Sequence, residues 1–121
     1  SKGPEELVFV EVKKSYPASA DPLDFVNAIN VSSINATVEL EEHGIRVIRI
    51  KGEPGLETPM HSHRAGITLP LTDINISHTN ADGEVGIINN KAGTISWAEP
   101  RSHKGKNLSD KSNEVILFEL M

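Results

Sequence analysis

Three histidines in this chain have the spacing of a metal site. His61 and His63 are separated by a single residue, and His103 follows forty residues later. Side chains at positions i and i+2 of a strand point to the same face, so two imidazoles on one strand can bind the same ion. A third imidazole from a neighbouring strand completes a facial set of ligands, as in three-histidine zinc sites. The sequence therefore predicts a divalent metal ion held by His61, His63 and His103.

The segments that carry these histidines have the pattern of short strands. Apolar and β-branched runs alternate with turn residues along the chain. We expect strands at residues 7–10, 37–42, 45–51, 60–64, 67–71, 75–79, 84–88, 94–97, 103–107 and 114–120. Short strands at regular spacing are typical of a β-sandwich or β-barrel.

Turn residues punctuate this pattern. His43-Gly44 predicts a two-residue hairpin with His43 exposed, and residues 80–83 predict another turn. Asp21-Pro22 is typical of a helix start, so one short helix is expected over residues 21–29.

The composition is that of one globular domain over residues 1–121. Hydrophobic residues make up 37% and charged residues 24% of the chain, and no apolar run approaches the ~20 residues of a membrane helix. A net charge of −5 argues against non-specific binding to nucleic acid or to an anionic membrane. Zero cysteines exclude disulfides, a thiolate nucleophile and a Cys-rich zinc site. We expect a soluble protein with a small-molecule partner, cytoplasmic by default, with an exported form left open.

Two segments resemble the two motifs of the cupin superfamily. A glycine followed after five residues by a His-x-His pair is similar to the first motif, here Gly55 and His61-Ser62-His63 within about residues 54–68. The second motif is a glycine, a proline, a histidine and an asparagine, here Gly93, Pro100, His103 and Asn107 within about residues 93–107. The resemblance spans about half of the chain and extends to small single-domain cupins, some loosely associated with β-alanine degradation.

This resemblance implies a fold and an assembly. The expected fold is all-β, a single-domain cupin-like jelly-roll β-barrel with at most one short helix. Many cupins pair through an N-terminal strand, which implies a homodimer.

One departure from the family pattern bears on the chemistry. Metal enzymes of the cupin superfamily usually place Glu or Gln four or five residues after the second histidine, where this chain has Ile67 and Thr68. Three neutral imidazoles leave the full charge of a divalent ion, so the site should favour anionic ligands. It should also lower the pKa of a bound water, as three-histidine zinc does, to about 7.

The histidine set does not specify the ion. Imidazole ligands suit Zn, Fe, Ni and Cu, and the identity depends on geometry and availability as much as on ligand type. We expect a divalent ion, Zn, Fe, Ni or Mn.

Residues near the histidines in sequence are candidates for substrate binding and proton transfer. Arg101 could bind a carboxylate bidentately, or be solvated at the rim together with Glu99. Trp97, Thr68 and Met60 could contact the substrate, although core packing is the default for apolar residues such as Trp97 and Met60.

His78 shares a face with Ile74 and Ile76 by the two-residue period of a strand. If the isoleucines point inward, His78 does too. It is then a fourth ligand, a general base, or a histidine hydrogen-bonded to a neighbour. Glu57, placed in the loop before the first motif, is a weaker candidate for a carboxylate ligand or base.

Several functions fit these residues. The first is a metal-dependent enzyme on a small carboxylate or carbonyl metabolite, with Arg101 orienting the anion and His78 or Glu99 moving protons. Ferrous oxygen chemistry on three histidines, similar in ligand set to thiol dioxygenases, is a variant. The alternatives are a non-catalytic small-molecule binding or sensing module with the cupin fold, and an interaction domain whose histidines are structural.

Overall fold

The computed structural model describes residues 35–121, which form nine strands. Their bounds are β1 (Asn35–Glu42), β2 (Ile45–Gly52), β3 (Glu57–His63), β4 (Gly66–Pro70), β5 (Ile74–Asn80), β6 (Val85–Asn90), β7 (Ser96–Ala98), β8 (Arg101–Asn107) and β9 (Asn113–Leu120). The strand expected at residues 7–10 and the helix expected at 21–29 lie outside the described residues. In the described part, no helix long and apolar enough to cross a membrane is found.

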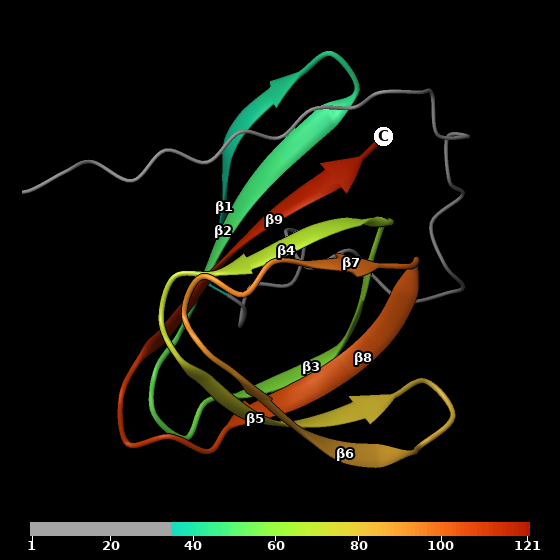
Figure 1. Cartoon of the computed structure of the whole chain (residues 1–121). Coiled ribbons are helices and arrows are strands. Elements are labelled where there is room, and N and C mark those ends of the chain that lie inside the picture. Colours follow the sequence, from blue (N-terminus) through green and yellow to red (C-terminus); the bar gives the residue numbers. More distant parts are fainter. Residues whose placement is uncertain (1–34) are drawn as a thin grey trace, which may run out of the picture.

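The strands form two antiparallel sheets that face each other (Figure 1). One sheet has five strands in the order β1-β2-β9-β4-β7, and the other has four in the order β3-β8-β5-β6. Strands adjacent in the sequence, such as β3 and β4, belong to different sheets, so the chain passes repeatedly from one layer to the other. The expected all-β jelly-roll fold is confirmed.

The first hairpin forms where the sequence predicts it. Residues His43 and Gly44 link β1 to β2 with positive φ angles of 54° and 78°, the backbone of a two-residue turn that matches strand twist. His43 is exposed, as expected. The strand expected at residues 94–97 begins two residues later, at Ser96, because the Thr94 N–H donates to the Lys91 carbonyl in the preceding turn.

Alternation along the central strands builds the interior. On β2, Ile48 is fully buried and Ile50 lines the space between the sheets. Their partners on β9 are Leu117 and Val115, which point the same way. Burial of large apolar side chains of this kind provides the main stabilisation of such a domain.

The opposite face of the five-stranded sheet is also apolar. One residue from each strand forms a continuous row of register partners, Leu40, Val47, Phe118, Ile67 and Trp97. The two ends of the row, Leu40 and Trp97, are exposed. Since neighbours along a strand point to opposite faces, Ile67 lies on this outer face and Thr68 faces the interior.

Gly66 lets β4 approach β9 closely. A Cβ atom at this position would lie 2.0 Å from the Phe118 carbonyl oxygen, a distance that no side chain tolerates. The glycine faces Glu119, which points into the interior from β9. Glycine at this position therefore lets β4 and β9 lie close together beside Glu119, the residue of the five-stranded sheet that contacts His63.

Candidate metal site and cavity

Three imidazoles converge between the sheets. His61 and His63 lie on β3 and His103 on the adjacent β8, with His61 and His103 in register. Their ring centroids are 4.7, 4.8 and 4.9 Å apart, and their candidate ligand atoms all lie within 4.8 Å of one another. The structure thus brings together the three residues that the sequence singled out.

A β-bulge aims His61 into the interior. Thr58 pairs with Gly105 and His61 pairs with His103, so β3 uses one more residue than β8 between these two pairs. The extra residue keeps both Thr58 and His61 on the interior face, where both line the cavity. Without this extra residue, strict alternation would place Thr58 and His61 on opposite faces of the sheet, and one of them would point outward.

The hydrogen bonds of His61 and His63 fix which nitrogen faces the cluster. His61 Nδ1 lies 2.7 Å from the Pro59 carbonyl oxygen, and His63 Nδ1 lies 3.2 Å from Glu119 Oε2. Both partners are acceptors only, so each Nδ1 carries the proton and each Nε2 has a lone pair. Metal-binding histidines are held in this way by a partner on the second nitrogen.

His103 is held by another histidine. His103 Nδ1 lies 2.8 Å from His78 Nε2, with the two ring centroids 4.8 Å apart. His78 sits on β5, and its side chain lines the cavity together with Ile74 and Ile76, so the predicted inward face is confirmed. Of the three roles considered for His78, the structure places it in a hydrogen bond to a neighbouring histidine.

Glu119 and Arg46 are site residues that the sequence reasoning missed. Glu119 is 1% exposed, and it accepts a hydrogen bond from Arg46 Nη2 at 2.9 Å as well as from His63. Burial alone would raise the pKa of Glu119, but the bonds from His63 and Arg46 hold it below its ordinary value. The signal was present, because Glu119 shares its period-two face with the inward Leu117 and Val115.

The imidazoles are neutral at physiological pH. Burial lowers the pKa of His61 to about 4, and burial also lowers the pKa values of His63 and His103, despite the hydrogen bond from His63 to Glu119. Neutral imidazole is the form that binds metal. The donor set therefore fits a divalent ion.

The position that usually supplies a carboxylate ligand holds an engaged hydroxyl. Thr68 faces the cavity, and its Oγ1 is 2.7 Å from Ser96 Oγ. Within residues 35–121, no Asp or Glu lines this cavity. The site therefore keeps the three-histidine character that the sequence predicts.

Comparisons with known proteins address the fold. No family model and no curated protein matches the chain. Solved structures match at low identity. A cupin domain from Bordetella pertussis has a TM-score of 0.67 at 19% identity, covering 83% of this chain and 99% of its own. An uncharacterised double-stranded β-helix protein from Klebsiella pneumoniae has a TM-score of 0.57 at 22% identity, covering 78% and 81%. A conserved barrel domain of the cupin 2 type from Salinispora arenicola has a TM-score of 0.53 at 14% identity, covering 84% and 90%.

The chain has the cupin fold. Within this fold, two residues of the segment that resembles the second cupin motif have different roles, because His103 belongs to the histidine cluster and Asn107 does not. Asn107 Nδ2 donates to the carbonyls of Gly52, Glu53 and Lys111 at 3.3, 3.1 and 3.0 Å, and its Oδ1 accepts from the Ser109 N–H at 3.0 Å. Asn107 therefore ties the β2–β3 loop to the β8–β9 loop.

The other predicted site residues divide into two groups. Arg101 and Thr68 line the cavity of about 400 Å³. Met60, Trp97 and Glu99 do not line it, and Trp97 is 48% exposed on the outer row. The sequence could not separate these groups, because all five lie close to the histidines along the chain.

Glu57 requires a correction. It is the first residue of β3 and pairs with Lys106, where the sequence analysis placed it in a loop. Its side chain is exposed and is not part of the histidine cluster. The strand extends further because the β-bulge between Thr58 and His61 lets β3 pair with β8 on both sides of it.

Proposed function

We propose that this cupin-fold domain binds a divalent metal ion through Nε2 of His61, His63 and His103 and, with it, a small carboxylate or carbonyl compound. The observation that carries the proposal is the set of three neutral imidazoles within 4.8 Å, each with Nδ1 already engaged. Such outer partners fix the ring orientation and the tautomer that a metal ligand needs.

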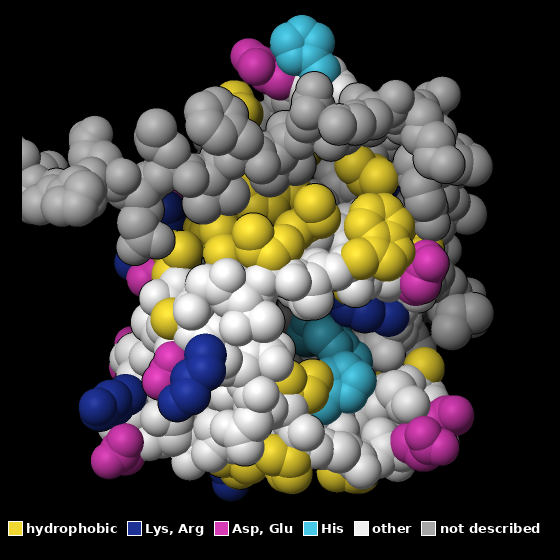
Figure 2. Space-filling view, viewed as in Figure 1, with side chains coloured by type: hydrophobic (Ala, Val, Ile, Leu, Met, Phe, Trp, Pro, Cys, Tyr) yellow, Lys and Arg dark blue, Asp and Glu magenta, His cyan; other side chains and the backbone are white. Residues whose placement is uncertain are grey.

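The charge around the cluster supports an anionic ligand. Arg101 lies two residues before His103 on β8, so both side chains point into the cavity. Its guanidinium stays charged although burial lowers its pKa. Figure 2 shows histidine side chains at the bottom of a hollow, beside a Lys or Arg side chain. With the ion added, the cavity becomes cationic and would attract a carboxylate.

Two residues of the cavity wall have roles in this proposal. A bound ion would act as a Lewis acid toward an oxygen of the ligand. Arg101 would orient the anionic group, and His78 would hold or move a proton at Nδ1, since its Nε2 is engaged with His103. Glu99 is exposed and away from the cavity, so proton transfer is assigned to His78.

The second candidate function is binding or sensing without turnover. It is favoured by the absence of a cavity-lining carboxylate among the described residues, by the Thr68–Ser96 hydrogen bond, and by His78 Nε2, which accepts from His103 when His103 Nε2 holds the ion and so is not free to take a proton from a ligand. Turnover of a carboxylate panel by the metal-loaded protein separates the two candidates.

Metal content tests the proposal directly. Protein purified without an affinity tag should contain about one ion per chain, and His61→Ala or His103→Ala should abolish it. His43→Ala is the matched control, because His43 lies exposed in the β1–β2 turn and should not affect the content. Stoichiometric ion in a protein carrying both His61→Ala and His103→Ala would refute the site.

A further inference from the structure

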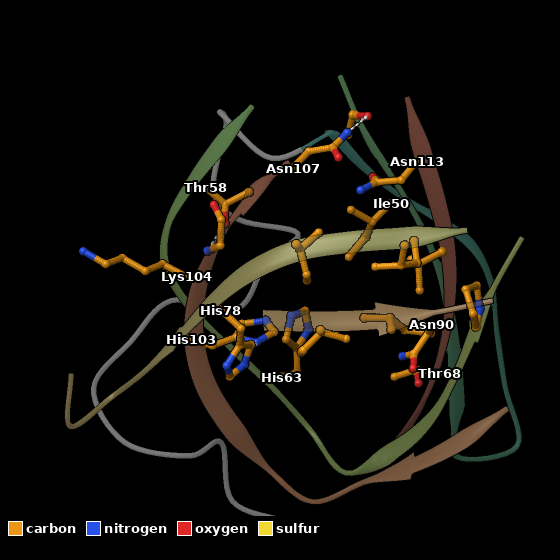
Figure 3. A pocket seen from close by; sticks show the side chains of 18 of the residues that line it. Ile50, Thr58, His63, Thr68, His78, Asn90, His103, Lys104, Asn107 and Asn113 are labelled. Carbon is orange, nitrogen blue, oxygen red and sulfur yellow. Dashed lines mark hydrogen bonds between the residues drawn. The ribbon is translucent and has the colours of Figure 1, made fainter. Parts of the chain in front are cut away.

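The cavity has a polar end and an apolar wall. Along β5, His78, Ile76 and Ile74 line it in succession, and each step of two residues advances about 6.6 Å. The imidazole of His78 and the side chain of Ile74 are therefore about 13 Å apart along the strand. In Figure 3, His63, His78 and His103 lie together, while Ile50 and Asn113 lie away from them toward the other end.

The apolar wall comes from both sheets. Six large aliphatic side chains of the strands line it, Ile50, Ile74, Ile76, Ile88, Val115 and Leu117, and Leu56 of the β2–β3 loop adds a seventh. A wall of this kind binds apolar groups, because contact with it removes their surface from water. The ion and the ligand's charged group need only the histidine end, so the wall must contact some other part of the ligand.

We infer that the ligand is a monocarboxylate with an aliphatic body, whose carboxylate lies at the histidine and Arg101 end and whose hydrocarbon chain lies along the isoleucine wall. The inference rests on the proposed function, since the ion and Arg101 supply the charge that holds the carboxylate. It excludes short, wholly polar acids as preferred ligands, because they would leave the wall in contact with water.

The volume bounds the size of the ligand. The cavity of about 400 Å³ has room for about a dozen water-sized groups at ~30 Å³ each. Octanoate has ten non-hydrogen atoms and comes close to this limit. Chain-length dependence should therefore continue from acetate to about octanoate and then level off.

The test is a series of straight-chain acids, acetate to decanoate, titrated into the zinc-loaded protein by calorimetry. The dissociation constant should fall about fourfold for each added methylene up to about octanoate. The matching alcohols should bind more weakly at every length, because they lack the carboxylate. Acetate binding to loaded protein with no gain along the series would overturn the inference and leave the proposed function intact, whereas failure of the protein to bind any of Zn, Fe, Ni or Mn would refute the proposed function itself.

A pair of variants locates the hydrocarbon chain. Ile88→Phe should weaken octanoate binding by tenfold or more and leave acetate binding unchanged, because Ile88 lines the wall. Ile87→Phe is the matched control, since Ile87 is the neighbouring residue of β6 and is 60% exposed. If Ile88→Phe does not fold, Ile88→Val should weaken octanoate binding about threefold. Equal effects of Ile88 and Ile87 substitutions would contradict this placement.

Discussion

The two ends of strand β8 present two kinds of motif residue. At one end, His103 uses Nδ1 in a hydrogen bond to His78 and directs its other nitrogen toward His61 and His63. At the other end, both polar atoms of Asn107 are engaged with the backbone of neighbouring loops. His103 is thus built to bind something further, and Asn107 to hold two loops together.

The difference shows how to assign a role to a buried polar side chain. A buried polar group without a partner is costly, so it persists where a partner is supplied from outside the chain. Three neighbouring imidazoles, whose candidate ligand atoms lie within 4.8 Å of one another and whose Nδ1 atoms are already hydrogen-bonded, are arranged to take such a partner. Asn107 does not, although it belongs to the same sequence motif as His103.

The largest effect is expected at Glu119, which supports the histidine end. Glu119→Leu would leave Arg46 as a buried charge without its partner, and breaking such a pair costs about 3–5 kcal/mol. It would also release His63 from its hydrogen bond and weaken metal binding about 10- to 100-fold. Urea unfolding of the metal-free protein and metal titration measure the two effects separately.

The double variant with Arg46→Met is the control for this prediction. It removes both charges, so much of the stability should return, while the metal affinity stays low because His63 still lacks its acceptor. Recovery of both properties together would show that Glu119 acts on the fold alone.

The next largest effect is expected at the opposite end of β8. Asn107→Ala removes the hydrogen bonds to both loops and should lower the free energy of unfolding by about 2–4 kcal/mol. Metal stoichiometry measured well below the melting temperature should stay at the wild-type value. Loss of the ion from folded Asn107→Ala protein would break the division between the two ends.

A smaller effect is expected at His78. His78→Phe keeps the ring's bulk and removes the hydrogen bond to His103 Nδ1, so metal affinity should fall about tenfold. His43→Phe, in the exposed turn, should have no effect on metal affinity. Complete loss of metal in His78→Phe would instead assign His78 as a direct ligand.

The smallest effect is expected at Trp97. The outer apolar row contains Trp97, away from the cavity, so Trp97→Ala should change carboxylate affinity of the metal-loaded protein by less than twofold. Calorimetric titration with octanoate measures it. A tenfold loss would place Trp97 in the ligand site after all.

Much of this architecture could be predicted from local sequence patterns. Turn residues and period-two alternation predicted all nine strands of the described part to within three residues at each end, and also the hairpin at His43-Gly44. The first and last residues of several strands differ from the prediction by one to three positions, because strand ends depend on pairing across the sheet. The expected homodimer stays a prediction.

The histidine set was predictable because its spacing reflects a strand's period. The inward direction of Glu119 was predictable in the same way, but its contact with Arg46 was not, since these residues meet only through the pairing of β2 with β9, seventy-three positions apart. Likewise, Trp97 and Glu99 lie outside the cavity because of which side of β7 packs toward the interior, and this depends on the pairing of β7 with β4. Long-range register is what local patterns leave open.

The most direct test of this account is the location of the ion by anomalous scattering from crystals of the metal-loaded protein. We predict one peak about 2.0–2.1 Å from Nε2 of each of His61, His63 and His103 if the ion is zinc. The Nδ1 atoms should keep their bonds to Pro59, Glu119 and His78. A peak bound through Nδ1, or one away from these histidines, would contradict the account.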